Sequence, residues 1–218
     1  MIKRIGDIVM ISLSSSDSNI YLVGDTVFDA GTGFNFVRLK SILNIAKKTF
    51  EDVKYVFITH EHFDHFGGVG FFSEAKIGMH KIAAPVLEKG DEEVSVADYF
   101  DGKIKTKPVA LKLNDGDKIN AGDREFTVIH TPGHTAGSVC FYCEKDKLLI
   151  SGDTVFADGI GRTDMPTGDP AAMTKSLEKL SKLSIEKILP GHGSYVDSGG
   201  SKLILKFLKD NVIQEDEI

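Results

Sequence analysis

The stretch Thr59-His60-Glu61-His62-Phe63-Asp64-His65 decides how this sequence is interpreted. It follows the apolar run 53–58, which is typical of a buried strand, and places three imidazoles and one carboxylate close together. In an extended loop, residues two apart project to the same side, so His60, His62 and Asp64 share a face. Burying four such groups is costly unless a cation compensates them. The stretch therefore predicts a metal site at the end of a strand.

The types of ligand narrow the choice of metal. Imidazole nitrogen and carboxylate oxygen suit zinc, iron or manganese, and a site without thiolate leaves coordination positions for water. A lone histidine is more often structural, and a polar loop is often only solvated. The clustering of four such groups argues against both of these interpretations.

Three more groups of the same kind occur further along the chain. Each follows a predicted strand at a glycine-containing turn: Pro132-Gly-His134, Ser151-Gly-Asp153 and Pro190-Gly-His192. Glycine lets the backbone approach closely at such turns. The predicted ligands thus come from four separate places: His60, His62, Asp64, His65, His134, Asp153 and His192.

In order and approximate spacing, this set resembles the motifs of the metallo-β-lactamase fold superfamily, and the resemblance spans nearly the whole chain. It implies that one metal ion is held by His60, His62 and His134. It implies that the second is held by Asp64, His65 and His192, and that Asp153 bridges both. The cofactor implied is two divalent metal ions, zinc first, with iron or manganese as alternatives. The fold implied is α/β, a four-layer αβ/βα sandwich, as a single domain over residues 1–218.

Particular residues narrow the resemblance within the superfamily. Asp153 in place of a thiolate argues against the best-known zinc β-lactamase class, and His62 in place of glutamate argues against the flavodiiron oxidoreductases. The strings 151–154, 159–164 and 190–193 are similar to the glyoxalase II-like and persulfide dioxygenase-like branch. The chain stops at Ile218 without the glutathione-gripping C-terminal domain of glyoxalase II, so we expect a single-domain glyoxalase II-like hydrolase with weak selectivity for the thiol half.

The implied activity is that of a dinuclear metal-dependent hydrolase acting on a thioester or ester. A hydroxide that bridges the ions is the expected nucleophile, with Asp64 as the catalytic residue that orients it. Two alternatives stay open. One is a mononuclear iron persulfide dioxygenase, for which His60, His134 and Asp153 supply a two-histidine, one-carboxylate face. The other is a nuclease or a non-catalytic metal-binding protein of the same fold.

The charge and the apolar content of the chain limit the classes of partner that we expect. The 218 residues carry 26 Lys+Arg against 32 Asp+Glu, a net charge of −6, and the lysines are spread among acids. Nucleic acid is therefore not expected as a partner. No apolar stretch approaches the ~20 residues that span a bilayer, so we expect a cytoplasmic protein with a small-molecule substrate and no membrane association. The oligomeric state is left undefined.

The periods of apolar residues predict the secondary structure. Strands are expected at 8–13, 20–23, 53–58, 77–80, 126–130, 138–143, 147–151 and 185–189, with a further β-rich run from 27. Helices are expected at 36–48, 67–72, 81–88, 170–183 and 201–208. The segment 90–107 has no clean period and is expected near the mouth of the substrate site.

Several other residues have competing interpretations. Cys140 and Cys143 lie three apart on a predicted strand, so they face opposite ways and are expected to be structural. Arg162 and Asp164 are expected to tie a loop, with substrate contact as the alternative. The remaining interpretations are as follows: His130 as a supporting donor near the site, His80 outside it, Asp25, Asp29, Asp115 and Asp117 as turn residues, and Phe34, Phe63, Phe66, Phe71 and Phe72 as core packing or the lining of an acyl site.

Overall fold

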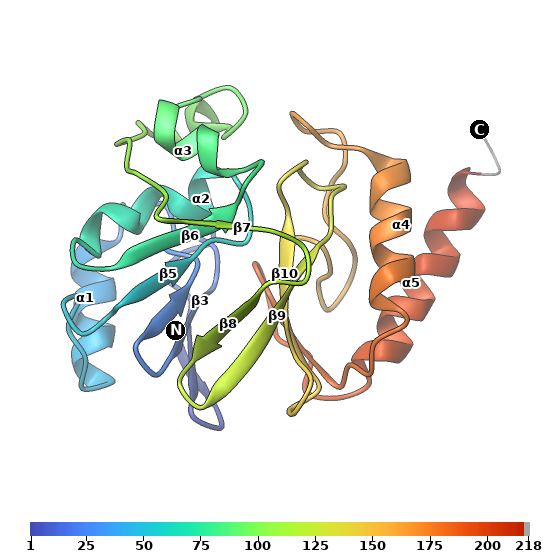
Figure 1. Ribbon diagram of the computed structural model, residues 1–218, viewed down its shortest axis with the longest axis horizontal. Helices are drawn as coiled ribbons and strands as arrows, with labels where there is room; N and C mark the ends of the chain where they lie inside the picture. Colours follow the sequence, from blue (N-terminus) through green and yellow to red (C-terminus); the bar gives the residue numbers. More distant parts are fainter. Residues whose placement is uncertain (216–218) are drawn as a thin grey trace. The chain divides into compact units, whose positions relative to one another are not determined.

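The computed structural model describes the backbone of residues 1–215 and the side chains of residues 1–211 (Figure 1). Backbone contacts divide the chain into two units. The first comprises Met1–Leu113 and Asn120–Arg124, and the second comprises Asn114–Ile119 and the chain from Glu125 onward. The chain forms two β-sheets with helices, as the α/β prediction requires. A single domain over residues 1–218 stays a prediction.

The first unit is built on a seven-stranded sheet in the order β1-β2-β3-β4-β5-β6-β7. Neighbouring strands are antiparallel from β1 to β4 and parallel from β4 to β7. Two-residue Gly-Asp turns join β1 to β2 and β3 to β4, and the glycines take the positive φ that such hairpins favour. The strands are β1 (Ile2–Ile5), β2 (Ile8–Ile11), β3 (Ile20–Val23), β4 (Thr26–Phe28), β5 (Tyr55–Phe57), β6 (Lys76–His80) and β7 (Leu111–Leu113).

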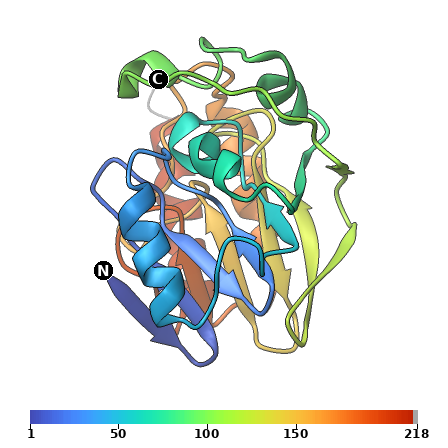
Figure 2. The same ribbon diagram turned by 90° about the vertical axis from the view of Figure 1, so that its left-hand side faces the viewer.

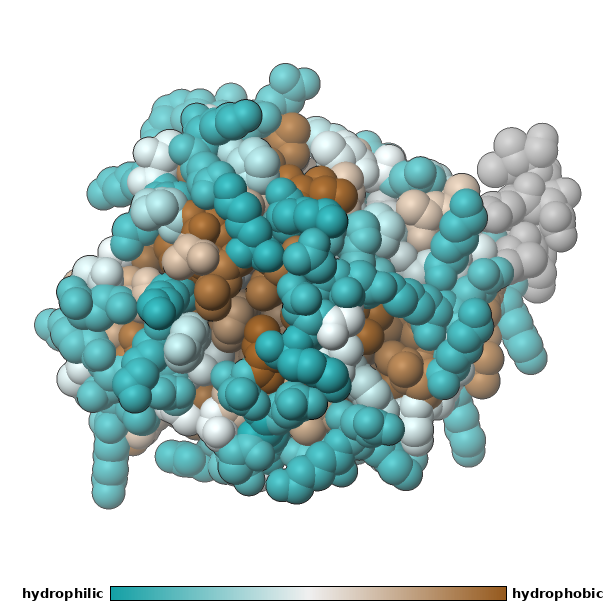
Figure 3. Space-filling view, in the orientation of Figure 1, coloured by the Kyte–Doolittle hydropathy of each residue, from teal (hydrophilic) through white to brown (hydrophobic). Residues whose placement is uncertain are grey.

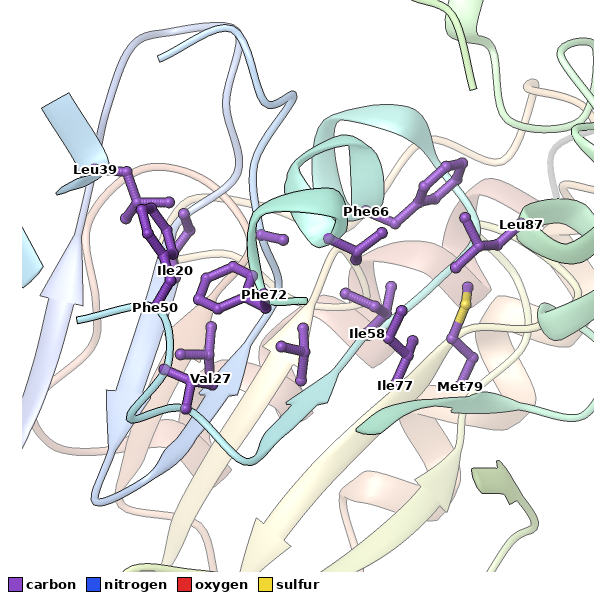
Figure 4. Packing of buried hydrophobic residues seen from close by; sticks show 14 of the residues in the cluster. Ile20, Val27, Leu39, Phe50, Ile58, Phe66, Phe72, Ile77, Met79 and Leu87 are labelled. Carbon is purple, nitrogen blue, oxygen red and sulfur yellow. The ribbon is translucent and has the colours of Figure 1, made fainter. Parts of the chain in front are cut away.

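Apolar side chains hold the helices of this unit against its sheet. Leu39, Ile42 and Leu43 of α1 join the same buried cluster as Ile20 and Val27 of the strands, and Figure 2 shows α1 lying in front of this sheet. Figure 4 shows Phe66 and Phe72 packed into this cluster beside the strands. Each such side chain contributes about 1.5–3 kcal/mol when fully buried. The helices are α1 (Phe36–Ile45), α2 (Phe63–Phe66), η1 (Gly67–Phe71), α3 (Ala84–Lys89) and η2 (Ala97–Phe100).

The second sheet is five-stranded, in the order β12-β11-β10-β9-β8. The β11–β12 pair is parallel, whereas β9, β10 and β11 pair antiparallel. Its strands are β8 (Lys118–Ala121), β9 (Arg124–His130), β10 (Val139–Cys143), β11 (Leu148–Gly152) and β12 (Lys187–Pro190).

Helices α4 (Pro170–Leu180) and α5 (Gly200–Glu215) lie side by side in the second unit (Figure 1). The Asp169 side chain caps α4 by accepting a hydrogen bond of 3.0 Å from the Ala172 backbone N–H, and Pro170 occupies the first turn, where no N–H partner is needed. The buried residues of α4 follow a helical spacing and share a core with β10, β11 and α5: Met173, Leu177, Leu180, Cys140, Leu149, Ile204 and Phe207.

Most predicted elements are confirmed, with differences at their ends. The helix predicted at 36–48 ends at Ile45 because Lys47 takes a left-handed φ of 58° that reverses the chain. The predicted helix 67–72 is a 3₁₀ helix, and α5 runs beyond 208. Sequence reasoning missed β1, β7 and β8, which lie at sheet edges and are only three or four residues long, too short for a clear pattern.

The surface agrees with the ordinary charged composition. Figure 3 shows hydrophilic side chains over most of the visible face, with smaller apolar areas between them. No helix in the described part of the chain combines the length and the apolar character that a bilayer span requires.

Candidate metal centre

Four predicted ligands form a buried cluster in the first unit. The chain leaves β5, and His60, His62, Asp64 and His65 follow on the loop and on α2, each no more than 6% exposed. His60 Nε2 lies 3.2 Å from His62 Nδ1, and the rings of His60 and His65 have centroids 4.0 Å apart. His65 Nε2 lies 3.6 Å from Asp64 Oδ2. The structure therefore brings these four side chains together as predicted.

Asp29, which directly follows β4, fixes the orientation of this cluster. One of its oxygens accepts a hydrogen bond of 2.8 Å from the Thr59 backbone N–H. The other lies 3.0 Å from Thr59 Oγ1 and 2.9 Å from His65 Nδ1. Donation from His65 Nδ1–H to this carboxylate leaves Nε2 as the acceptor nitrogen, which is the form that ligates metals.

The interpretation of Asp29 as a plain turn residue is therefore wrong. It is 1% exposed, has a φ of 59°, and is accompanied by a histidine that lies 36 residues away in the sequence. The signal that could have found it is the parallel pairing of β4 with β5, which brings Asp29 and Thr59 to the same edge of the sheet. The other aspartates of that group do occupy turns, where Asp117 accepts from the Asn114 backbone N–H at 2.7 Å.

Backbone hydrogen bonds from two neighbouring loops hold the same segment. The Ala30 N–H donates to the His65 carbonyl at 2.7 Å, and the Ser18 N–H donates to the Asp64 carbonyl at 3.2 Å. Asp17, 4% exposed, accepts at 2.8 Å from the Thr32 backbone N–H and at 2.7 Å from its hydroxyl. The ligand loop is thus fixed by contacts within its own unit.

The other three predicted ligands form a cluster in the second unit. His134 follows β9, Asp153 follows β11 and His192 follows β12. A single oxygen, Asp153 Oδ2, lies 3.7 Å from His134 Nε2 and 3.5 Å from His192 Nε2. His134 Nδ1 donates to the Arg162 carbonyl at 2.7 Å, so its Nε2 is the acceptor nitrogen.

Gly161 makes that last contact sterically feasible. A Cβ at this position would lie 1.9 Å from the Asp153 carbonyl oxygen and 3.1 Å from His134 Cβ. Only glycine lets the loop 159–164 pass this close to two predicted ligands. The sequence string is therefore explained by packing against the cluster.

Arg162 and Asp164 pair with each other on the surface. Arg162 Nε and Nη2 each donate at 2.9 Å to an Asp164 oxygen, and the two side chains are 66% and 69% exposed. This hydrogen-bonded pair holds the pKa of Asp164 below its usual value. The contact is local to the turn, as the structural interpretation expects, while the Arg162 backbone supports His134.

Four other singled-out residues lie outside the two clusters. His130 Nε2 lies 2.9 Å from the Ala136 carbonyl, so it supports the loop that carries His134. His80 is buried on β6. Cys140, like Cys143, is a buried free cysteine, and burial raises the pKa of the Cys140 thiol to about 11. The structural interpretation of both cysteines is consistent with this.

The chemistry of the donors fits a divalent cation in both clusters. In each, an acceptor nitrogen faces a carboxylate oxygen at 3.5–3.7 Å, beyond the usual 2.7–3.2 Å of a hydrogen bond. Two ligand atoms around one ion, each at about 2.0–2.2 Å, produce a separation of this size. Desolvated acceptors aimed at one another are otherwise costly.

Comparisons with known proteins agree with this chemistry. The metallo-beta-lactamase superfamily model matches residues 14–192. The chain is 32% identical over 206 residues to the acyl-coenzyme A thioesterase MBLAC2 of Gallus gallus, covering 82% of this chain and 73% of that protein. It is 34% identical over 145 residues to the hydroxyacylglutathione hydrolase of Maricaulis maris, covering 66% of this chain and 50% of that protein.

A solved structure extends the likeness to three dimensions. TTHA1623, crystallised in a di-iron-bound form, is 28% identical, with a TM-score of 0.74 over 91% of this chain and 97% of that chain. The family match covers both units and all seven predicted ligands. The chain is therefore a metallo-hydrolase of the metallo-β-lactamase superfamily.

Proposed function

We propose that the two clusters together form one dinuclear metal centre that hydrolyses thioesters. In this proposal His60, His62 and His134 hold one ion, Asp64, His65 and His192 hold the other, and Asp153 bridges them. The observation that carries it is the position of Asp153 Oδ2, which faces one histidine of each set. Zinc is the first choice of metal, with iron or manganese as alternatives.

The roles of the protein side chains follow from their surroundings. Two divalent ions, when bound, supply Lewis-acid polarisation of a carbonyl and acidify a shared water toward neutral pH. Asp29 and the Arg162 carbonyl hold His65 and His134 in the tautomers that present Nε2. Asp64, at the N-terminal turn of α2, orients the attacking water through its carboxylate. The buried cluster also limits access of bulk water.

Thioester substrates are proposed from the relatives. The names of two groups of them, acyl-coenzyme A thioesterase and hydroxyacylglutathione hydrolase, both describe thioester cleavage. Their thiols differ, whereas the acyl–sulfur bond is common to both. We accordingly place the acyl thioester, and not a particular thiol, at the centre of the proposal.

The test combines metal analysis with a substrate panel. Purified protein is analysed for zinc, iron and manganese. Hydrolysis is assayed with acetyl-coenzyme A, octanoyl-coenzyme A and S-lactoylglutathione, and oxygen uptake with glutathione persulfide is followed with an oxygen electrode. We expect two metal equivalents and hydrolysis of thioesters. Bound iron with sulfur-dependent oxygen uptake and no thioester turnover would instead support the persulfide dioxygenase. Salt-dependent cleavage of nucleic acid would support the nuclease.

A further inference from the structure

A cavity of about 290 Å³ lies within the first unit, beside the ligand loop. Phe34, Phe63 and Phe71 line it, together with Thr32 and the chain around Gly67 and Gly70. The Phe34 and Phe63 rings have centroids 5.9 Å apart, and Phe63 stands in the sequence between two predicted ligands, His62 and Asp64. An apolar cavity thus adjoins one half of the metal centre.

The aromatic lining remains partly accessible. Phe34 is 60% exposed, although leaving a large apolar side chain in water is unfavourable. Phe63, in contrast, is buried, so the two rings form the outer and inner parts of one wall. An aliphatic ligand would cover the exposed ring.

Cationic side chains of the segment 90–107 stand at the rim of this cavity. Lys103 pairs with Glu92 at 3.0 Å and with Asp98 at 3.7 Å, so its charge is offset. Lys105 also lines the cavity, and it forms no ion pair or hydrogen bond within residues 1–211. The Lys105 ammonium, which no carboxylate of the described side chains offsets, therefore stands at an apolar opening and can contact the anionic group of an amphiphile.

Two glycines at the cavity wall, Gly67 and Gly70, differ in whether they can be replaced by a larger residue. A Cβ on Gly67 would lie 2.3 Å from the Thr32 carbonyl oxygen, so this glycine is required by the fold. Gly70 differs, because a Cβ there would meet no atom within 4 Å. A side chain at position 70 can therefore fill the cavity without disturbing the backbone.

We propose that this cavity binds the aliphatic acyl chain of a thioester whose thiol half carries phosphate, and that Lys105 contacts that phosphate. The inference rests on the proposed function and adds the part of the substrate that gives selectivity. It also gives the segment 90–107 a role at the mouth of the substrate site.

The first test is the dependence of kcat/KM on chain length, from butanoyl- to octanoyl-coenzyme A. Each methylene that enters the cavity should raise kcat/KM about two- to fourfold. Gly70→Leu should remove this rise. It should lower kcat/KM for octanoyl-coenzyme A about tenfold or more and change kcat/KM for butanoyl-coenzyme A less than about twofold. Gly70→Ala should give an intermediate profile. An unchanged profile in Gly70→Leu, with thermal unfolding like that of the wild type, would overturn the proposal.

The second test separates the phosphate contact from the acyl chain. Lys105→Glu should lower kcat/KM for octanoyl-coenzyme A about tenfold. The same variant should keep kcat/KM for the neutral octanoyl-N-acetylcysteamine within about twofold of the wild-type value. Lys76→Glu is the matched control, since Lys76 is an exposed lysine of β6 that does not line the cavity. Equal losses on both thioesters, or from both variants, would refute the contact with Lys105.

A binding measurement keeps this inference distinct from the hydrolase proposal. S-octyl-coenzyme A, a thioether that cannot be hydrolysed, should bind the wild-type protein in calorimetry and bind Gly70→Leu at least about tenfold more weakly. Such binding without any thioester turnover would sink the proposed function and keep the cavity assignment. Turnover with equal affinity of both proteins for the thioether would do the reverse.

Discussion

Replacing Asp29 tests how the chain presents His65 to a metal. Its carboxylate accepts from the Thr59 backbone N–H, the Thr59 hydroxyl and His65 Nδ1, all at 2.8–3.0 Å and all buried. Asp29→Ala leaves two buried N–H groups without an acceptor, at about 1–3 kcal/mol each. It also places alanine at a φ of 59°, which adds about 1 kcal/mol of strain. We expect a loss of about 3–7 kcal/mol in the free energy of unfolding.

Asp29→Asn is the sharper variant, because asparagine tolerates the left-handed conformation. Its carbonyl oxygen keeps the bond from the Thr59 N–H, while its amide now donates toward His65 Nδ1. That donor favours the tautomer with the proton on Nε2, which cannot ligate through that atom. We expect the free energy of unfolding to fall by only about 1–2 kcal/mol and metal affinity to fall about 10–100-fold.

Urea unfolding and competition with a chelating dye measure these two quantities. Asp25→Asn is the control: this turn aspartate forms a partly exposed ion pair of 3.2 Å with Lys54, worth less than about 1 kcal/mol, and makes no contact with a predicted ligand. If Asp29→Asn bound metal as tightly as the wild type, the orientation of His65 would not depend on this carboxylate, and our account of it would be refuted.

Three further predictions follow from single contacts. Asp153→Ala should lower metal content and thioester turnover together, because the carboxylate that faces His134 and His192 is lost; full metal occupancy in elemental analysis would exclude the bridging role. Arg162→Ala should change thermal unfolding or loop order more than turnover, and a large loss of kcat with unchanged unfolding would place the guanidinium at the substrate. Cys140 should resist iodoacetamide at pH 8, because burial raises the pKa of its thiol to about 11. The folded state therefore favours the protonated thiol. The stability that this preference supports is complete below about pH 9 and is lost as the pH rises toward 11. Peptide mass spectrometry measures the alkylation, and rapid alkylation of Cys140 in the native protein would contradict a buried, protonated thiol.

The proposed ligands could be picked out from the sequence because each one is marked locally. The stretch 59–65 combines spacing with residue type, and the others follow strands at glycine-containing turns. The structure places the two groups of ligands in two clusters as those positions require. The long elements were also predictable, since their buried faces repeat at a regular period.

The supporting groups were not predictable in this way because they act across long separations. Asp29 reaches His65 only through the pairing of β4 with β5, and the Arg162 carbonyl reaches His134 only because Gly161 permits a close approach. The rim lysines belong to a segment without a clean period. Edge strands such as β8 were missed because an alternation over only 4 residues is too short to be recognised.

The most direct measurement of the central claim is a crystal structure of the metal-loaded protein with anomalous data at the absorption edge of the bound metal. We predict two peaks about 3.5–4 Å apart, both within ligand distance of Asp153, with His60, His62 and His134 on one and Asp64, His65 and His192 on the other. A single peak, or peaks bound by only one of the two clusters, would contradict the dinuclear centre.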